Sequence, residues 1–317
     1  MSGWVFLDLR EPSGTFGYAP NKRPLDLLIR YGVINLDKPR GPTSNYVVHV
    51  IKKVLNLKKA AHGGTLDPKV SGVLPILLED SVKVLNLMNR FDKEYVCLMH
   101  LHKNVSANKL KNICKEFEGV IYQKPPVKSA VSRKIRKRKI YEIEVLEKEG
   151  RDVLLRVRCE AGTYIRKLVH DIGRALGINA NMLELRRTRF GVFREEDSVT
   201  LQDVLKAVYL WKECENEEVL RKIILPVEKI LSVVPKVVIK DTAVEAICHG
   251  ANLSAKGIAQ LETDVKANEQ VAILTLKGEL VALGKALVNA EEFKKSKGIV
   301  VDIEKVIMKP GLYPKCW

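Results

Sequence analysis

The sequence contains no apolar run long enough to cross a bilayer, so it offers no transmembrane helix. Its first residues, MSGWVFLDLREPSG, lack the basic region and long apolar core of a secretory leader, so we expect neither secretion nor a membrane partner. The 6 cysteines form no CxxC pair, which argues against a zinc ribbon and a disulfide framework. Reduced thiols and a cytoplasmic location are the resulting expectations.

Several nucleotide and metal motifs are also missing. The sequence has no GxGxxG, no GxxxxGK[ST] and no HExxH, the local signatures of dinucleotide sites, P-loops and zinc proteases. His100 and His102 fall on one face of an expected strand, but no further ligands accompany them, so the metal interpretation is weak. We therefore expect neither a cofactor nor a metal.

Positive charge is what the sequence has in excess. Lys and Arg number 54 against 38 Asp and Glu, which gives a formal net charge of +16. Such a surplus favours a polyanionic partner, either nucleic acid or an anionic membrane surface. The 317 residues are enough for one large domain with a buried core and a small second domain.

One stretch, HGGTLDPKVSGVLP at 62–75, places a single carboxylate, Asp67, between a glycine pair and a proline. Glycine permits close backbone approach, and Pro68 drives the residue before it out of helical geometry. The apolar run at 73–78 predicts a buried strand. We expect Asp67 on a stiff loop against the core, with its carboxylate buried; an ordinary Asx turn before a strand is the alternative.

This stretch resembles the central motif of the TruB/dyskerin family of RNA pseudouridine synthases, and within it the archaeal-type catalytic subunits of H/ACA guide ribonucleoproteins. Further segments resemble other family motifs in the same order, and together they span nearly the whole chain: GVINLDKPRGPTS (32–44), KEYVC (93–97), CEAGTYIRKL (159–168) and LELRRTR (183–189). The resemblance implies an α+β fold, in which a catalytic domain on a mixed, mostly antiparallel sheet precedes a small β-barrel PUA domain. Gly63 departs from the family, since many relatives carry a small polar residue there.

The chain is expected to divide into three parts. Residues 1–30, rich in proline and glycine, indicate an extended arm, and the resemblance implies that this arm packs on the PUA domain. Residues 31–234 form the expected catalytic domain. Residues 235–317 have short strands at the turn spacing of a small β-barrel, in agreement with the PUA resemblance.

Local patterns predict the main elements of these parts. Thr43 or Ser44 caps one helix, Ser106 caps a second and Thr200 a third. On the strand at 183–189 we expect Leu183 and Leu185 on one side and charge on the other. The remaining expectations are a short helix after residue 80, strands at 93–102, 140–145 and 153–160, helices at 164–176, 201–208 and 242–249, a surface helix or loop at 211–220, and a hairpin at 269–288 that turns at 277–278.

A basic stretch at 122–139 contains eight Lys and Arg and no acid. With its two prolines it fits a mobile loop that closes on phosphates; a solvated charged loop is the alternative. The resemblance implies the thumb loop that grips substrate RNA. Its candidate RNA-binding residues are Lys124, Lys128, Arg133 and Lys134.

The implied reaction breaks the glycosidic bond of a uridine, rotates the base and rejoins it through carbon. Asp67 is the candidate nucleophile, because a carboxylate can form a covalent intermediate; whether it attacks sugar or base stays open. A buried carboxylate without a cation would protonate. We expect Arg166 to pair with Asp67, since a guanidinium stays charged and fits a carboxylate.

Tyr95 is expected to stack on the extruded base and to serve in the deprotonation step; a core tyrosine is the alternative. The resemblance adds a second pocket tyrosine, Tyr164, and an apolar wall, Leu185. It also places His62 where the base leaves its stack, although a structural or turn role would explain this histidine equally well.

In the C-terminal part, HGANLSAKG (249–257) resembles the stretch that accepts the 3′ trinucleotide of the RNA. Gly250 and Ala251 would allow close approach of the nucleic acid backbone, and Lys256 is a further RNA-binding candidate. Gly250 would serve equally well as a helix C-cap.

The resulting hypothesis is a pseudouridine synthase within an H/ACA particle, acting on rRNA and on tRNA, with guide RNA, target RNA and small particle proteins as partners. The arm, the PUA segment and the lack of a lysine-rich nuclear tail favour this archaeal type. A stand-alone synthase of the tRNA T-arm is one alternative. A non-catalytic RNA scaffold is another, opposed by the joint presence of the five site residues Asp67, Tyr95, Tyr164, Arg166 and Leu185.

Overall fold

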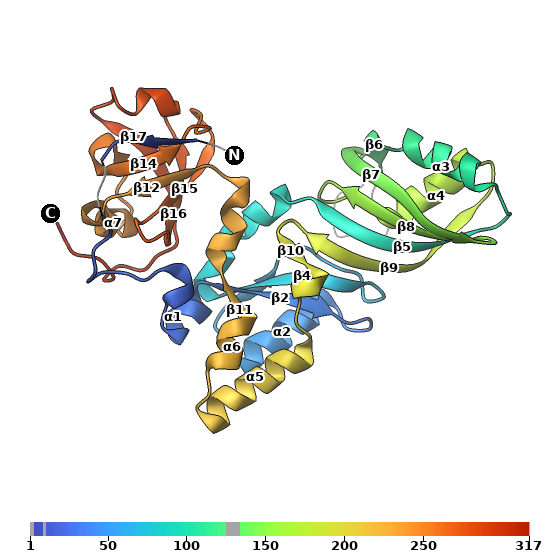
Figure 1. Cartoon of the computed structure of the whole chain (residues 1–317), viewed down its shortest axis with the longest axis horizontal. Coiled ribbons are helices and arrows are strands. Elements are labelled where there is room, and N and C mark those ends of the chain that lie inside the picture. The colour runs from blue at the N-terminus through green and yellow to red at the C-terminus, as the bar shows by residue number, and fades with distance from the viewer. Residues whose placement is uncertain (1–2, 9–10, 125–133, 317) are drawn as a thin grey trace.

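Two sheets organise the chain. The computed structural model describes residues 3–8, 11–124 and 134–316, and within these residues the strands form a ten-stranded and a seven-stranded sheet. Figure 1 shows the sheets in separate bodies, with α2, α5 and α6 below the end of the larger sheet formed by β11, β2 and β4, and α3 and α4 at its far end. The expected α+β class is confirmed.

The larger sheet has the order β11-β2-β4-β9-β5-β8-β7-β6, with β3 on β4 and β10 on β9. All of these pairs are antiparallel except β4 with β9, so the predicted mixed, mostly antiparallel sheet is confirmed. Its strands are β2 (Gly32–Lys38), β3 (Ala60–His62), β4 (Ser71–Leu78), β5 (Lys93–Leu101), β6 (Gly119–Gln123), β7 (Arg136–Glu149), β8 (Asp152–Cys159), β9 (Ala180–Phe190), β10 (Phe193–Arg194) and β11 (Ile224–Pro226).

The parallel junction between β4 and β9 is short. It consists of the pairs Ser71↔Arg186 and Gly72↔Arg187. Gly72 has a φ of 107°, and a Cβ atom there would lie 2.2 Å from the Arg187 carbonyl oxygen, so glycine is required for the strands to meet. Asp67, Tyr95 and Leu185 lie on the elements that flank this junction.

The helices follow their sequence signals closely at their starts. The Thr43, Ser106 and Thr200 hydroxyls accept hydrogen bonds from backbone amides of the first turns, so all three predicted caps are confirmed. The helices are α1 (Leu25–Arg30), α2 (Ser44–Val54), α3 (Ala107–Glu116), α4 (Ile165–Ala175), α5 (Leu201–Cys214), α6 (Glu218–Ile223) and α7 (Asp241–Cys248).

Two helix predictions were wrong in extent. The short helix expected after residue 80 is a 3₁₀ segment, η2 (Glu79–Arg90), which packs apolar side chains such as Val84 and Leu87 into the core. The helix expected to end at residue 208 continues as α5 to Cys214. The next residue, Glu215, caps it with a left-handed φ of 53°. The polar and acidic residues from 211 onward, for which the sequence predicted a surface helix or a loop, begin in the last turn of this helix.

The predicted basic loop at 122–139 was also wrong at both ends, because Tyr122 lies in β6 and residues 136–139 lie in β7. The high positive charge of residues 136–139 favoured a loop in the sequence prediction, whereas these residues form part of a strand. The Lys137 and Lys139 ammonium groups lie 5.9 and 5.5 Å from the ring centres of Tyr122 and Tyr141, on the solvent side of the hairpin. The candidates Lys128 and Arg133 fall outside the described residues.

The second sheet has the order β1-β14-β12-β15-β16-β17-β13. The predicted hairpin turn is confirmed, since Gly278 has a φ of 84° between β15 and β16. From the N-terminal arm, β1 pairs antiparallel with β14. The strands are β1 (Trp4–Phe6), β12 (Lys236–Ile239), β13 (Leu253–Ser254), β14 (Ile258–Glu262), β15 (Gln270–Leu274), β16 (Leu280–Ala286) and β17 (Ile299–Val306).

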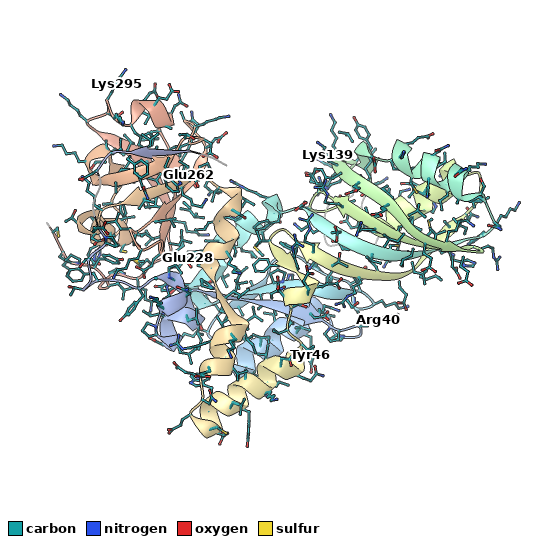
Figure 2. The ribbon with its side chains drawn as sticks, in the orientation of Figure 1. Arg40, Tyr46, Lys139, Glu228, Glu262 and Lys295 are labelled. Carbon is teal, nitrogen blue, oxygen red and sulfur yellow. The ribbon has the colours of Figure 1, made fainter. Side chains whose placement is uncertain are left out.

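A buried ion cluster joins the arm, the linker between the bodies and the second sheet. The Arg23 guanidinium donates to both Glu228 carboxylate oxygens, at 2.6 and 3.0 Å. The Leu280 amide donates to the same carboxylate at 2.8 Å, and Glu279 accepts from the Tyr313 hydroxyl at 2.6 Å. Arg23 and Glu279 are almost fully buried, and Figure 2 labels Glu228 where the bodies meet.

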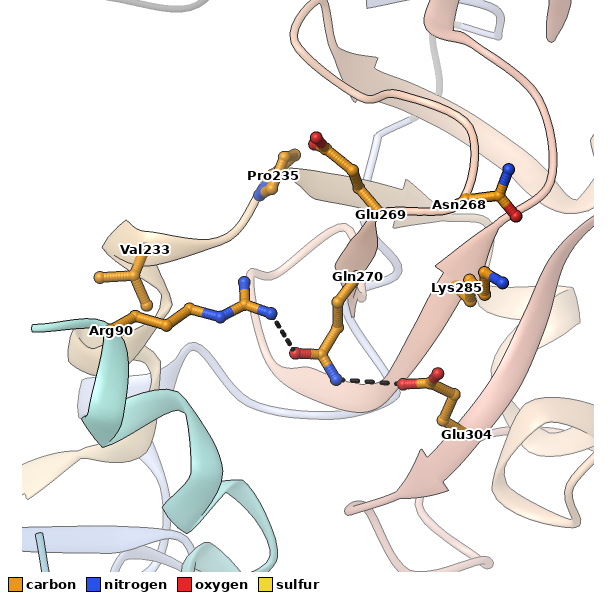
Figure 3. A pocket seen from close by; sticks show the side chains of 8 residues that line it. All are labelled: Arg90, Val233, Pro235, Asn268, Glu269, Gln270, Lys285 and Glu304. Carbon is orange, nitrogen blue, oxygen red and sulfur yellow. Dashed lines mark hydrogen bonds between the residues drawn. The ribbon is translucent and has the colours of Figure 1, made fainter. Parts of the chain in front are cut away.

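A cavity of about 650 Å³ lies between η2, the linker and the second sheet. Figure 3 shows Arg90 reaching from η2 to Gln270 of the second sheet, with a hydrogen bond of 2.9 Å, and Gln270 donating to Glu304 at 3.1 Å. None of the predicted site residues lines it; the lining residues are Arg90, Val233, Pro235, Asn268, Glu269, Gln270, Lys285 and Glu304.

Candidate active site

Asp67 lies on the loop between β3 and β4, and the residue before it is fixed by one hydroxyl. Ser44 Oγ donates to the Leu66 carbonyl at 3.0 Å and accepts from the Leu66 amide at 2.9 Å. Ser44 is the first residue of α2 and is buried. The motif at 32–44 and the Asp67 motif therefore form one structural unit.

The other side of the loop is held by a buried lysine. Lys38 Nζ donates to the Val70 carbonyl at 2.8 Å, and the Gly41 amide donates to the Pro68 carbonyl at 2.8 Å. Burial lowers the pKa of Lys38, while nearby Asp67 raises it. With anchors before and after Asp67, the loop has the stiffness expected from its sequence.

Arg166 and Asp67 meet as expected. Arg166 Nη2 donates to Asp67 Oδ2 at 3.0 Å, across 99 positions of sequence. The expected burial of Asp67 is wrong, however: both side chains are 58% exposed. The anchored atoms of the loop are those of its backbone, and the carboxylate projects outward from them.

The position of Arg166 depends on a clamp that the sequence did not reveal. Tyr164 is the N-cap residue of α4, and its amide donates to Gln123 Oε1 at 2.9 Å. Gln123 Nε2 donates to the Tyr164 carbonyl at 3.1 Å, and this glutamine is buried at the end of β6. The amide side chain thus ties the start of α4 to the β6–β7 hairpin.

An apolar patch lies at the base of the Asp67 loop. Tyr95 and Leu185 pack against the buried side chains of Leu66, Val70 and Leu74. Both candidates come from neighbouring strands, β5 and β9. The structure thus brings these two pocket candidates to the loop that carries Asp67.

A buried cation beside the pocket candidates that the sequence prediction missed is Arg187. It is 1% exposed, and it donates from Nε to the Val73 carbonyl at 2.7 Å and from Nη2 to the Gly64 carbonyl at 3.0 Å. The expectation that charge faces away from the apolar side of β9 was therefore wrong. Two-residue periodicity from Leu185 would have placed Arg187 on the pocket side.

Leu183 is a correction on the same strand. A register irregularity between Leu98 and Met99 of β5 lies opposite this part of β9, and Leu183 is 52% exposed. Leu185, beyond the irregularity, faces the pocket. A β-bulge resets the alternation of side chains, which simple periodicity does not anticipate.

His62 is the last residue of β3 and not part of a turn, which leaves a structural role as the alternative to RNA contact. Its Nε2 atom lies 3.1 Å from Asn45 Oδ1, while Nδ1 is buried and has no hydrogen-bond partner among the described residues. Burial lowers the pKa of His62, and the Arg187 cation lowers it further. At neutral pH the imidazole is neutral.

The remaining RNA-binding candidates lie on the surface. Lys124 and Lys134 are exposed at the two ends of the described hairpin, and Lys256 is exposed in the second body. Gly250 follows α7 with a φ of 90°, as a helix C-cap does. Ala251 lines a hollow of about 560 Å³, whose other lining residues are Ala246, His249 and Lys315.

Neither a metal centre nor a membrane span emerges from the geometry. In the described ranges, no group of three or more His, Cys, Asp or Glu side chains is arranged to hold a metal ion. Within the same ranges, no helix combines the length and the apolar character needed to cross a membrane.

Family models match the chain nearly end to end. Residues 52–165 match the TruB family pseudouridylate synthase N-terminal domain, and residues 166–232 match the tRNA pseudouridylate synthase B C-terminal domain. Residues 235–307 match the PUA domain, and residues 10–48 match the DKCLD (NUC011) domain.

Named relatives are similar over their full length. The probable tRNA pseudouridine synthase B of Pyrococcus furiosus is 56% identical over 309 residues, which are 97% of this chain and 91% of that protein. The protein of the same name from Methanocaldococcus jannaschii is 53% identical over 308 residues, with 97% and 92% covered.

Solved structures agree with this. A chain in the structure of an H/ACA RNP bound to a substrate RNA containing 2′-deoxyuridine has a TM-score of 0.93 and 53% identity, with 100% of this chain and 98% of that chain covered. A chain in a Cbf5–Nop10–Gar1 complex has a TM-score of 0.93 and 55% identity, with 99% and 97% covered.

Proposed function

Because this chain belongs to the TruB family and is an RNA pseudouridine synthase, we propose that it works as the catalytic subunit of an H/ACA guide RNA–protein particle. The observation that carries the proposal is the match, over 100% of the chain, to a protein within such a particle bound to substrate RNA. Pairing of β1 with β14 supports it, since the arm is thereby part of the fold.

The active-site roles we propose follow from the geometry. Asp67 is the nucleophile, and Arg166, 3.0 Å away, keeps it ionised when RNA excludes water from the site. Tyr95 supports the extruded base and removes the carbon-bound proton. Tyr164, Leu185 and His62 complete the pocket.

The partners we propose are a guide RNA, a target RNA and small particle proteins. Solved relatives occur with substrate RNA, and with Nop10 and Gar1. For RNA contact we propose the exposed basic residues Lys124, Lys134 and Lys256, together with Lys128 and Arg133, and for the 3′ end of the guide the Gly250–Ala251 turn. We propose rRNA as a substrate, and processing of tRNA as well.

A cytoplasmic location completes the proposal. Cys97, Cys114, Cys159 and Cys248 are buried free thiols, and burial raises the pKa of each to about 12. Thiols of this kind are inert packing groups that suit a reducing compartment.

A second candidate is a stand-alone tRNA enzyme, which the names of the curated relatives favour. The test compares pseudouridine formation by the purified chain on two substrates: a tRNA transcript alone, and a target RNA with guide RNA and partner proteins. Conversion that requires the guide supports our proposal. Equal conversion of tRNA without guide or partners would replace it with the second candidate.

We expect Arg166→Met to lower kcat by about 10²-fold and to leave the Kd for RNA within about threefold of wild type. The reason is that Arg166 offsets the charge of Asp67 only when RNA covers both groups, since both are half-exposed without it. Single-turnover pseudouridine assays and filter binding measure the two quantities. Arg156→Met is the control, because Arg156 also forms an exposed ion pair, with Glu144 of the neighbouring strand β7. Equal losses in both variants would remove the special role of Arg166.

A further inference from the structure

Three buried cations lie on β2, β5 and β9, and among the described residues none of them forms a salt bridge with a carboxylate. Lys38 and Arg187 are bound by backbone carbonyls, and so is Lys93, whose Nζ donates to the Phe91 carbonyl at 2.7 Å. All three are buried. A buried cation that is balanced only by carbonyl dipoles and rings leaves a positive potential that can stabilise an anion nearby.

Arg187 is the one of the three that lies directly opposite Tyr95, as its Cα partner in the pairing of β5 with β9. Its guanidinium is held in place by the Val73 and Gly64 carbonyls and lies 5.0 Å from the centre of the Phe190 ring. The Lys93 ammonium lies 4.1 Å from the centre of the same ring. Among the described residues its hydrogen bonds go to the Met88 and Phe91 carbonyls and not to Tyr95. The Arg187 guanidinium is therefore held in one place, on the residue paired with Tyr95.

The charges that face the Tyr95 hydroxyl come from three elements. Burial raises the pKa of Tyr95, and Arg187 of β9 opposes that rise. Negative charge on Asp67 of the loop, or on Cys159 of β8, would raise the pKa of Tyr95 further. The Cys159 thiol, with a pKa of about 12, stays neutral. Arg187 stays charged despite its burial, because a guanidinium holds its proton.

We propose that Arg187 is a positioning residue for the proton-removal step: it fixes the Tyr95 oxygen and stabilises its anionic form. The proposal rests on the proposed function. After the base has been rejoined through C5, that carbon carries both C1′ and a hydrogen. The Tyr95 oxyanion takes this hydrogen as a proton and becomes the neutral phenol.

The electrons of this step balance without a cofactor. The pair of the broken C5–H bond restores the C5–C6 double bond. If C6 is doubly bonded to N1, the electron pair of that π bond moves to N1, which takes a proton from water. If the Asp67 oxygen is bonded to C6 instead, the pair of the C6–O bond leaves with that oxygen. Tyr95 then returns its proton to solvent for the next turnover.

The test compares RNA that carries uridine, 5-deuterouridine or 5-fluorouridine at the target position. With Arg187→Met we expect kcat on uridine to fall about 10²-fold, and the deuterium isotope effect to increase because proton removal becomes rate-limiting. Cleavage of the N-glycosidic bond of 5-fluorouridine, which precedes proton removal, should stay within about threefold of wild type. The rise of kcat with pH should move to higher pH, since loss of Arg187 raises the pKa of Tyr95 and its base form then appears at higher pH.

Lys93→Met is the matched control: it removes a buried cation from the same ring and should leave the isotope effect unchanged. If Arg187→Met does not fold, Arg187→Lys keeps the charge with one carbonyl contact fewer, and should show a smaller increase of the isotope effect. Equal slowing of all three substrates with an unchanged isotope effect would overturn the proposal and make Arg187 a purely structural residue. A wild-type chain that converts none of the substrates would overturn the proposed function itself.

Discussion

Asp67→Asn lowers pseudouridine formation by at least about 10⁴-fold and leaves RNA binding within about threefold of wild type. The amide keeps the shape of the side chain but cannot supply the attacking oxygen. Stability is expected to be unchanged, because the ion pair with Arg166 is more than half exposed and such pairs contribute little. Single-turnover assays, filter binding and thermal unfolding measure the three quantities.

The control for this variant is Glu144→Gln. Glu144 also pairs with an arginine, Arg156, on an exposed part of the larger sheet. It should retain wild-type activity, which separates loss of the nucleophile from loss of an ion pair. An Asp67→Asn protein that still forms pseudouridine at a rate near that of wild type would contradict the role of Asp67.

Arg23→Met is expected to lower the free energy of unfolding by about 3–5 kcal/mol, since it leaves two carboxylates buried without their cation. Glu228 would keep its bond from the Leu280 amide, and Glu279 its bond from Tyr313, but both would lose the cation that lies 2.6 and 4.0 Å from them. Chemical denaturation with a tryptophan signal measures the change.

Arg90→Met provides the control for Arg23→Met. Arg90 also bridges the two bodies, through the exposed hydrogen bond to Gln270 seen in Figure 3. Its loss should change the free energy of unfolding by less than about 0.5 kcal/mol. If both variants lose the same stability, the buried cluster has no special part in joining the bodies.

Local features of this fold could be predicted from the sequence because their causes are local. A hydroxyl three residues before a free backbone amide caps a helix, as Thr43 and Ser106 do, and a glycine at a hairpin tip supplies positive φ, as Gly278 does. The meeting of Asp67 with Arg166 is not local. It could be expected only from the resemblance to a family.

Burial and long-range polar contacts could not be predicted. The exposure of Asp67 depends on the neighbours of its loop, and the clamp of Gln123 on Tyr164 joins residues 41 positions apart. Arg187 was missed because a charged residue on a strand usually faces solvent. The resemblance implied only that the N-terminal arm packs on the PUA domain; the pairing of β1 with β14 was not predicted, since this short strand has no periodic signal of its own.

The two residue pairs between β4 and β9 are the whole connection between the halves of the larger sheet's main strand path, so we expect each half to open as a separate cooperative unit. Asp67 belongs to the unit of β2, β3 and β4, whereas Tyr95 and Arg187 belong to the unit of β5 and β9. Sub-global opening at this boundary would scatter the catalytic groups while each unit keeps its own ladders. Backbone amide protons of the two units would then differ in their protection from hydrogen exchange. On heating, enzyme activity would be lost at a lower temperature than the unfolding of either unit.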